Sequence, residues 1–179
     1  MKEGWEVNVV SCLKLPWKIL SPNSLWVNWV KAYLIRKGSL WMLKDNTQAG
    51  SWMWRKVLKY REIAKSFYKV EVRNGDKTSF WYETWSSLGC LQDGGCIVIG
   101  ILINATVAEC RSHRRRQHRD LMLNKVEEEI EKYKANLVDE EDMSLWRNEK
   151  GRYKRRFSTR GTWLCIRERY LECHWHKVI

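Results

Sequence analysis

The stretch KVEVRNGDKTSFWYETW (residues 69–85) decides the predicted fold, because turn-forming residues in it separate two segments of strand-like composition. Val70 and Val72 alternate with charged residues, and Asn74-Gly75 supplies two positions that tolerate a positive φ angle. Residues 78–85 then return as a β-branched and aromatic run. This pattern predicts a β-hairpin. Its aromatic surface is too large to leave in water, so it forms either part of the core or a platform on which a ligand or a base stacks.

Helical patterns precede this hairpin. A capping serine followed by apolar residues at three- and four-residue spacing predicts a helix over residues 51–67, which leads directly into the hairpin. The same kind of pattern predicts a helix over residues 24–37, which Gly38 ends. The apolar run at residues 7–20 contains Pro16, which lacks a backbone N–H and clashes with the preceding turn, so only a short helix is expected there.

A second set of helical signals follows the hairpin. Thr106 and Glu109 have the spacing of a capping box, which predicts a brief helix. An apolar stripe over residues 123–137 predicts an amphipathic helix that is either solvent-exposed or one half of a helix pair, and the acidic run at residues 139–142 ends it. The helix carries four acidic side chains that the pattern places beside or opposite the stripe: Glu127, Glu128, Glu129 and Glu131.

The last forty residues have the signals of a second hairpin and a helix. Residues 144–147 are strand-like, residues 148–151 form a turn, and residues 152–157 are the returning strand. Ser158 or Thr159 then caps the last helix.

These signals predict an α+β fold of several short helices and two β-hairpins, loosely packed and without a large sheet. Four segments are expected: a truncated helical segment at 1–50, a helix plus hairpin unit at 51–100, a basic-to-acidic amphipathic helix at 101–138, and a hairpin plus C-terminal helix at 139–179.

The composition of the 179-residue chain favours an anionic partner. Thirty-three Lys and Arg face 21 Asp and Glu, a formal net charge of +12, and an excess of that size attracts phosphate backbones through counterion release. The first twenty residues lack the uninterrupted apolar region of a secretory signal, and no run of eighteen apolar residues is free of charge. We therefore expect a nuclear or cytoplasmic protein with no membrane partner.

The sequence offers little catalytic chemistry. It contains no G-x-S-x-G elbow, P-loop or G-x-G-x-x-G, so neither an enzyme nor a cofactor or small-molecule partner is predicted. Four residues near the end invite comparison with a zinc site: Cys165, Cys173, His174 and His176. Their spacing is not that of a zinc finger or knuckle, and the consecutive residues Cys173 and His174 do not easily point at one ion. No metal site is therefore predicted.

Two basic patches, each accompanied by aromatic residues, are the candidate binding residues. The first consists of Arg111, Arg114, Arg115, Arg116 and Arg119; the second consists of Arg152, Lys154, Arg155 and Arg156. Trp146 and Tyr153 adjoin the second patch, and charge beside aromatic rings suits single-stranded nucleic acid. The competing interpretation is that these charges form a solvated face that balances the neighbouring Glu-rich helix.

Several phrases, in order along the chain, resemble one family. They are SLWVNWVKAYLIRKGSLW (24–41), SWMWRKVLKYREIAKSF (51–67), VRNGDKTSFWYETW (72–85), ATVAE (105–109) and LWRNEKGRYKRRFSTRGTWLCIR (145–167). Together they are similar to the carboxy-terminal tract of plant LINE-like (non-LTR) retroelement reverse transcriptases, after the polymerase core and just before a zinc-binding domain.

This resemblance implies a parent protein with RNA-directed DNA polymerase activity. The chain has no Tyr/Phe-x-Asp-Asp polymerase motif, and it stops at Trp175-His176-Lys177, where the family continues into a zinc module. The expected function is therefore that of a non-catalytic fragment with non-specific RNA or DNA binding at most. The alternative is a structural or interaction remnant without a ligand, whose Trp-rich surfaces once packed on the polymerase and zinc domains.

Overall fold

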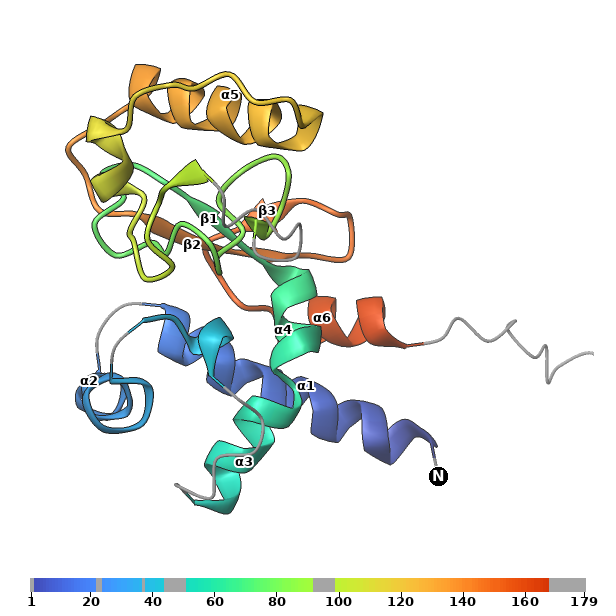
Figure 1. Cartoon of the computed structure of the whole chain (residues 1–179). Helices are drawn as coiled ribbons and strands as arrows, with labels where there is room; N and C mark the ends of the chain where they lie inside the picture. Colours follow the sequence, from blue (N-terminus) through green and yellow to red (C-terminus); the bar gives the residue numbers. More distant parts are fainter. Residues whose placement is uncertain (1, 22–23, 37, 44–50, 92–98, 168–179) are drawn as a thin grey trace, which may run out of the picture.

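The structure is a computed structural model that describes residues 2–21, 24–36, 38–43, 51–91 and 99–167. Its elements in chain order are α1 (Lys2–Leu20), α2 (Leu25–Val30), the π-helical turn η1 (Lys31–Ile35), the 3-10 turn η2 (Leu40–Met42), α3 (Trp52–Lys59), α4 (Arg61–Phe67), β1 (Tyr68–Glu71), the 3-10 turn η5 (Ala108–Ser112), α5 (Leu121–Ala135), β2 (Met143–Arg147), β3 (Tyr153–Lys154) and α6 (Thr159–Ile166). The sheet lies between the N-terminal helices α1, α2 and α3 on one side and α5 on the other (Figure 1). A mixed α+β fold without a large sheet is thus confirmed.

The sheet has three antiparallel strands in the order β1-β2-β3. Trp146 of β2 lies opposite Tyr68 of β1 and opposite Lys154 of β3. The Asn148 side-chain oxygen closes the β2–β3 turn by accepting from Lys150 N at 3.0 Å and Arg152 N at 2.9 Å. The predicted second hairpin is therefore confirmed.

The predicted first hairpin, over residues 69–85, is wrong. β1 pairs with β2, which lies more than seventy residues further along the chain. Residues 78–85 run as turns and isolated bridges instead, with Ser79 bridged to Thr106 and Phe80 N bonded to Ala105 O at 2.9 Å. One backbone bond, from Val70 N to Thr84 O at 3.0 Å, links the two halves of the expected hairpin.

The carboxylate of Asp142 explains why the turn at Asn74-Gly75 does not pair its flanks. It accepts from Arg73 N at 2.8 Å, Gly75 N at 2.9 Å and the Thr78 hydroxyl at 2.7 Å. A charged acceptor bonded to three donors competes strongly with the ladder of a short hairpin. The acidic run predicted as a plain linker is therefore what holds this turn against β2.

The prediction of only a short helix around Pro16 is also wrong, because α1 runs from Lys2 to Leu20 through the proline. A proline inside a helix costs about 3 kcal/mol. Val9, Leu13 and Ile19 on this helix are each at most 1% exposed, and full burial of each such side chain contributes about 1.5 to 3 kcal/mol. Burial on both sides of Pro16 therefore outweighs its local penalty.

Both other N-terminal helices begin at the predicted serines but do not continue as expected. The hydroxyl of Ser24 accepts from Val27 N at 3.3 Å, and that of Ser51 accepts from Trp54 N at 3.4 Å. The first helix passes into the π-helical turn η1, and Arg36, not Gly38, ends it with a φ of 62°. The second is broken at Tyr60 into α3 and α4.

The caps predicted in the second half are confirmed. Thr106 N donates to the Glu109 carboxylate at 3.0 Å, and Glu109 N donates to the Thr106 hydroxyl at 3.4 Å, which is a reciprocal capping box. The Ser158 hydroxyl accepts from Gly161 N at 3.0 Å at the start of α6.

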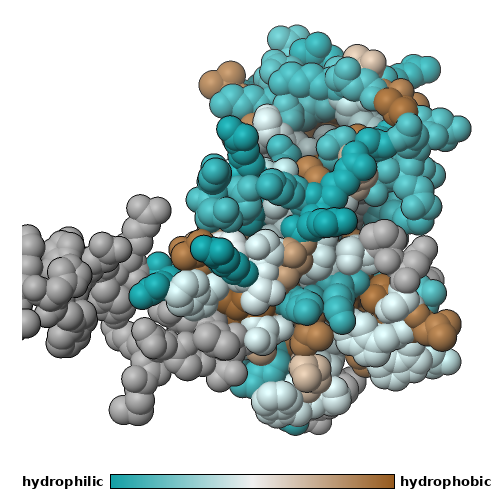
Figure 2. Space-filling view, turned by 180° about the vertical axis from the view of Figure 1, so that it is seen from behind, coloured by the Kyte–Doolittle hydropathy of each residue, from teal (hydrophilic) through white to brown (hydrophobic). Residues whose placement is uncertain are grey.

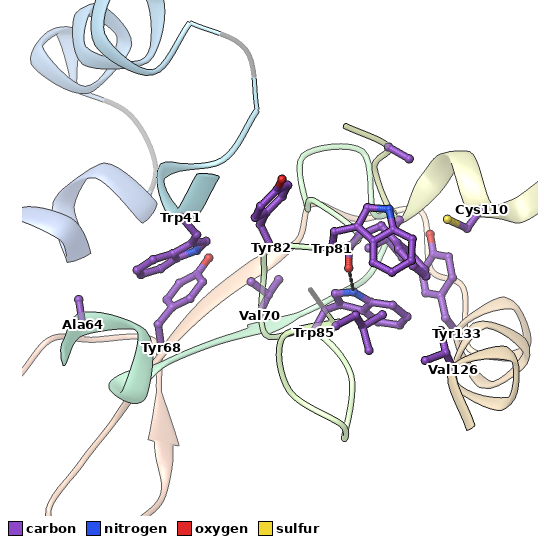
Figure 3. Close-up of a cluster of buried hydrophobic side chains, with 14 of the residues drawn as sticks. Trp41, Ala64, Tyr68, Val70, Trp81, Tyr82, Trp85, Cys110, Val126 and Tyr133 are labelled. Carbon is purple, nitrogen blue, oxygen red and sulfur yellow. Dashed lines mark hydrogen bonds between the residues drawn. The ribbon is translucent and has the colours of Figure 1, made fainter. Parts of the chain in front are cut away.

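The main core surrounds the aromatic run of residues 80–85 (Figure 3). Trp81 is 0% exposed, its indole N–H donates to Leu102 O at 2.8 Å, and its ring meets that of Phe80 edge to face at 4.9 Å. Trp85 packs edge to face against Tyr133 of α5 at 6.4 Å. Of the two interpretations of this run, the structure supports the core and not an open stacking platform.

Candidate functional site

Most of the first basic patch lies in an irregular segment, residues 113–119, which connects η5 to α5 and runs alongside that helix (Figure 1). We call residues 113–119 the basic loop. Arg114, Arg115, Arg116 and Arg119 are all exposed in it. Across the described residues, none of these four side chains has a carboxylate within ion-pair distance. The cationic groups are therefore available to an external anion.

Two histidines fasten the basic loop to α5. The Nε2 atom of His113 lies 3.0 Å from each oxygen of the Glu127 carboxylate, and Nε2 of His118 lies 3.1 Å from one of them. Glu127 is 0% exposed, and the histidine side chains are only 10% and 14% exposed. We call these three residues the histidine–glutamate anchor.

The electrostatics of the anchor identify the donors. Burial raises the pKa of Glu127, but the hydrogen bonds from His113 and His118 outweigh it and bring that pKa below its usual value. The carboxylate is therefore ionised at neutral pH and can only accept, so each histidine presents a protonated Nε2 to it. A buried charge with paired donors resists displacement, because separating them would leave the charge unpaired.

Further hydrogen bonds fix the loop backbone beside the anchor. His118 N donates to the Asn124 side-chain oxygen, and the Asn124 amide returns a bond to His118 O, both at 2.8 Å. The Lys134 ammonium donates to His113 O at 2.5 Å. Both ends of the arginine run are thus held while the arginine side chains remain in solvent.

Arg111 differs from the rest of its patch. Its guanidinium donates to Asn74 O at 2.7 Å, and Tyr133 Oη donates to the same carbonyl at 2.7 Å. Hydrogen bonding with Tyr133 raises the pKa of Arg111. This arginine supports the turn at residues 74–75, so the structure gives it a contact that the other arginines of the patch lack.

The second patch lies on β3 and the residues on either side of it. Arg152, Lys154, Arg155 and Arg156 are exposed, and the described chain contains no ion pair that involves them. Tyr153 is 40% exposed, and Lys69 Nζ lies 5.9 Å from its ring centroid. Trp146 cannot present a surface to a ligand, because it is 1% exposed and stacks on Phe67 at 5.5 Å.

Two hollows lie along α5. One, of about 630 Å³, is lined by Arg115 and Arg116 of the basic loop and by Asn124 and Glu128 of α5. The other, of about 370 Å³, lies between the sheet and α5 and is the sheet–helix groove. Its lining includes Lys69, Val70, Trp85, Lys132, Tyr133, Asn136, Leu145 and Tyr153.

The exposed side of α5 connects the two hollows. Asn124 and Glu128 line the first, whereas Lys132 and Asn136 line the groove. These four residues recur every four positions, so they follow one row along the helix surface. Seen from behind, the upper part of the molecule gathers hydrophilic side chains, at the height where Figure 1 places α5 (Figure 2). This row of α5 residues therefore links the basic loop to the groove that Tyr153 of β3 lines.

The sequence missed the burial of two acids on α5. Glu127 and Glu129 were expected in solvent, but they are 0% and 8% exposed. Glu129 accepts from Lys132 Nζ at 2.8 Å and from Ser87 N at 2.7 Å. Burial raises the pKa of Glu129, and these bonds more than offset that effect. A histidine on each side of the arginine run, fourteen and nine residues before Glu127, was the available signal for the anchor.

Metal-ligating residues do not cluster in the described ranges. There, no three His, Cys, Asp or Glu side chains are arranged to hold a metal ion. Cys165 is exposed, and Cys173, His174 and His176 lie outside the described residues.

The described helices include none that is both long enough and apolar enough to cross a membrane. No protein-family model, no curated protein and no solved structure matches the chain.

Proposed function

We propose that this chain is a non-catalytic region of a plant LINE-like reverse transcriptase and that it binds single-stranded RNA or DNA without sequence specificity. The observation that carries the proposal is the contrast within the basic loop. Its backbone is held by the buried anchor of His113, His118 and Glu127, while its arginine side chains are exposed and unpaired in the described structure.

The charge and the fixed backbone of the basic loop both favour binding to a polyanion. Each phosphate neutralised by an arginine releases condensed counterions, and this gain does not depend on base sequence. A loop that is already ordered loses less conformational entropy when it binds than a mobile one would. The net charge of +12 adds a long-range attraction for a polyanion.

The absence of catalysis is part of the proposal and is supported by the way in which three acids are bonded. Glu127 and Glu129 are bonded to histidine, lysine and backbone donors, and Asp142 is bonded to three groups of the 73–78 turn. Phosphoryl transfer by the two-metal route requires carboxylates free to hold metal ions. In addition, the sequence contains no Tyr/Phe-x-Asp-Asp motif.

The experiment is a titration of fluorescent single-stranded RNA at two salt concentrations with the full chain and two triple variants. One variant replaces Arg114, Arg115 and Arg116 with Ala; the control replaces Lys14, Lys18 and Arg55, which are exposed on α1 and α3. Both variants reduce the formal charge from +12 to +9 by removing three cations.

The loop variant should bind the RNA more weakly than the control variant does. The slope of log K against log salt concentration should also be shallower for the loop variant, by about 0.7 for each phosphate that it no longer neutralises. Equal weakening of both variants would show that only net charge matters, and no binding at low salt would refute the proposal.

One observation favours a second candidate, an interaction module without a nucleic-acid ligand. Leu25, Trp26, Trp29 and Tyr33 on α2 and η1 are 90%, 40%, 50% and 64% exposed. The Trp29 and Tyr33 rings stack on each other at 5.6 Å, and apolar patches of this kind mark protein interfaces. This candidate predicts that Trp29→Ser with Tyr33→Ser raises solubility in ammonium sulfate and leaves RNA binding and stability unchanged.

A further inference from the structure

We infer that the sheet–helix groove receives one unpaired base of the bound strand, stacked on Tyr153. The inference rests on the proposed function and extends it, because the basic loop accounts for phosphate binding and leaves the groove unused. It also assigns a role to Tyr153, which lies within the second basic patch along the chain.

The groove has the size and lining that a base requires. Its volume of about 370 Å³ suits one planar heterocycle with its sugar, and Val70, Leu145 and the largely buried rings of Trp85 and Tyr133 supply apolar lining. Asn136 Nδ2 donates to Lys132 O at 2.8 Å, which leaves the side-chain oxygen of Asn136 to accept from the edge of a base.

Tyr153 is the residue best placed for stacking. It lies on the two-residue edge strand β3, is 40% exposed, and lines the groove. Stacking on an aromatic ring is tolerant of sequence, because every base has a π face. Lys69 Nζ lies 5.9 Å from the Tyr153 ring centroid, so a phosphate next to the stacked base would meet a cation.

The charged side chains at the groove are compatible with a phosphate beside the bound base. Lys69 and Lys132 line it. The acids there are already paired: Glu129 with Lys132 Nζ at 2.8 Å, and Glu71 with Arg73 at 3.6 Å. Among the described residues Lys69 has no carboxylate partner, so it is the groove cation that a phosphate can meet, and both groove carboxylates are already paired.

The basic loop and the sheet–helix groove are close enough to bind one nucleic-acid strand. The row Asn124, Glu128, Lys132 and Asn136 leads from the hollow under the basic loop to the groove. It spans about 18 Å at about 1.5 Å per residue, which is within the reach of a short single strand. Phosphates at the basic loop and a base at Tyr153 can therefore belong to the same molecule.

The test compares two oligonucleotides of about 10 nucleotides, a length within the usual site size for single-strand binding. One carries bases, with 2-aminopurine as a fluorescent base, and the other has the same backbone without bases. The full chain is titrated as wild type, Tyr153→Leu, Tyr153→Phe and the control Tyr33→Leu, which changes an exposed tyrosine on η1.

We expect the wild type to prefer the base-containing strand by about tenfold and to quench 2-aminopurine. Tyr153→Leu should lose this preference and the quenching while it still binds the abasic strand. Tyr153→Phe and Tyr33→Leu should behave as the wild type.

Two failures are distinguishable. If both strands bind equally well to the wild type, or if Tyr153→Leu retains the preference and the quenching, the groove inference is overturned and phosphate binding by the basic loop stands. If neither strand binds at low salt, the proposed function itself is overturned. A third outcome would assign the groove to a protein partner and also overturn the inference. In it, Tyr153→Leu abolishes binding of an acidic aromatic peptide but leaves the preference for the base-containing strand unchanged.

Discussion

Glu127 and His113, which lie fourteen residues apart, meet through both oxygens of a fully buried carboxylate, each 3.0 Å from Nε2 of the imidazole. Together with His118 this contact converts an arginine-rich connection into a held segment on the surface of α5. A similar arginine run without the buried acid would have no fixed position, because its own charges repel one another.

Replacing Glu127 with Gln should lower the free energy of unfolding at pH 7 by about 1 to 3 kcal/mol, since the imidazole donors lose a charged acceptor. The pKa of Glu127 is lowered by folding, so its contribution is present above its usual value of 4.5 and is lost as the pH falls through the folded value. The gap between wild type and variant should therefore narrow in acid. Urea denaturation at pH 7 and at pH 3 measures it. Glu128→Gln, an exposed neighbour, is the control, and an equal effect of both would contradict the anchor.

Glu83 should make the free energy of unfolding fall as the pH rises, whereas Glu127 makes it fall as the pH drops. Burial raises the pKa of Glu83 to about 8, although the Ser39 hydroxyl, which donates to it at 3.2 Å, favours the ionised form. Its folded pKa lies above the unfolded value, so the folded protein holds a proton that the unfolded chain has released. Stability should then fall between about pH 4.5 and 8, by at most about 1.4 kcal/mol per pH unit. Glu83→Gln should flatten this part of the stability profile, measured by urea denaturation; an unchanged slope would show that Glu83 does not titrate as proposed.

Trp81→Ala should lower the free energy of unfolding by about 3 to 5 kcal/mol, as truncation of a fully buried aromatic side chain does. The change also leaves Leu102 O without its indole donor. Trp29→Ala is the matched control, because Trp29 is 50% exposed and should change stability by less than about 0.5 kcal/mol. Equal chemical denaturation midpoints for Trp81→Ala and the wild type would rule out a core centred on residues 80–85.

Gly75→Ala should destabilise the fold more than Gly151→Ala does. Both glycines have a left-handed φ, +76° and +73°, so each substitution carries a backbone penalty of about 1 to 2 kcal/mol. A Cβ at Gly75 would lie 2.6 Å from Tyr133 Oη and 2.8 Å from Ala108 N, whereas one at Gly151 meets nothing within 4 Å. Thermal denaturation of the two variants isolates the steric part, and equal melting temperatures would show that the 73–78 turn does not pack against α5 and η5 as described.

Local signals in the sequence were sufficient for part of the fold. The capping box of Thr106 and Glu109, the serine caps and the hairpin around Asn148 all depend on residues within four positions of each other. Their geometry is set by short-range hydrogen bonds, so adjacent residues specify it. The basic patches were equally visible, because exposed charge needs no partner from elsewhere in the chain.

Only the tertiary structure decided which strand pairs with β1, whether the helix passes through Pro16, and where the acids of α5 lie. Asp142 holds the Asn74-Gly75 turn from more than sixty residues away, and Glu127 is buried because two histidines reach it from a separate segment. Such contacts depend on elements meeting in space, and their energies exceed the local preferences that a sequence pattern expresses. The sequence alone thus determined the charge of this protein and the local form of its helices and turns, whereas long-range packing decided which charges are buried to hold the structure and which remain exposed.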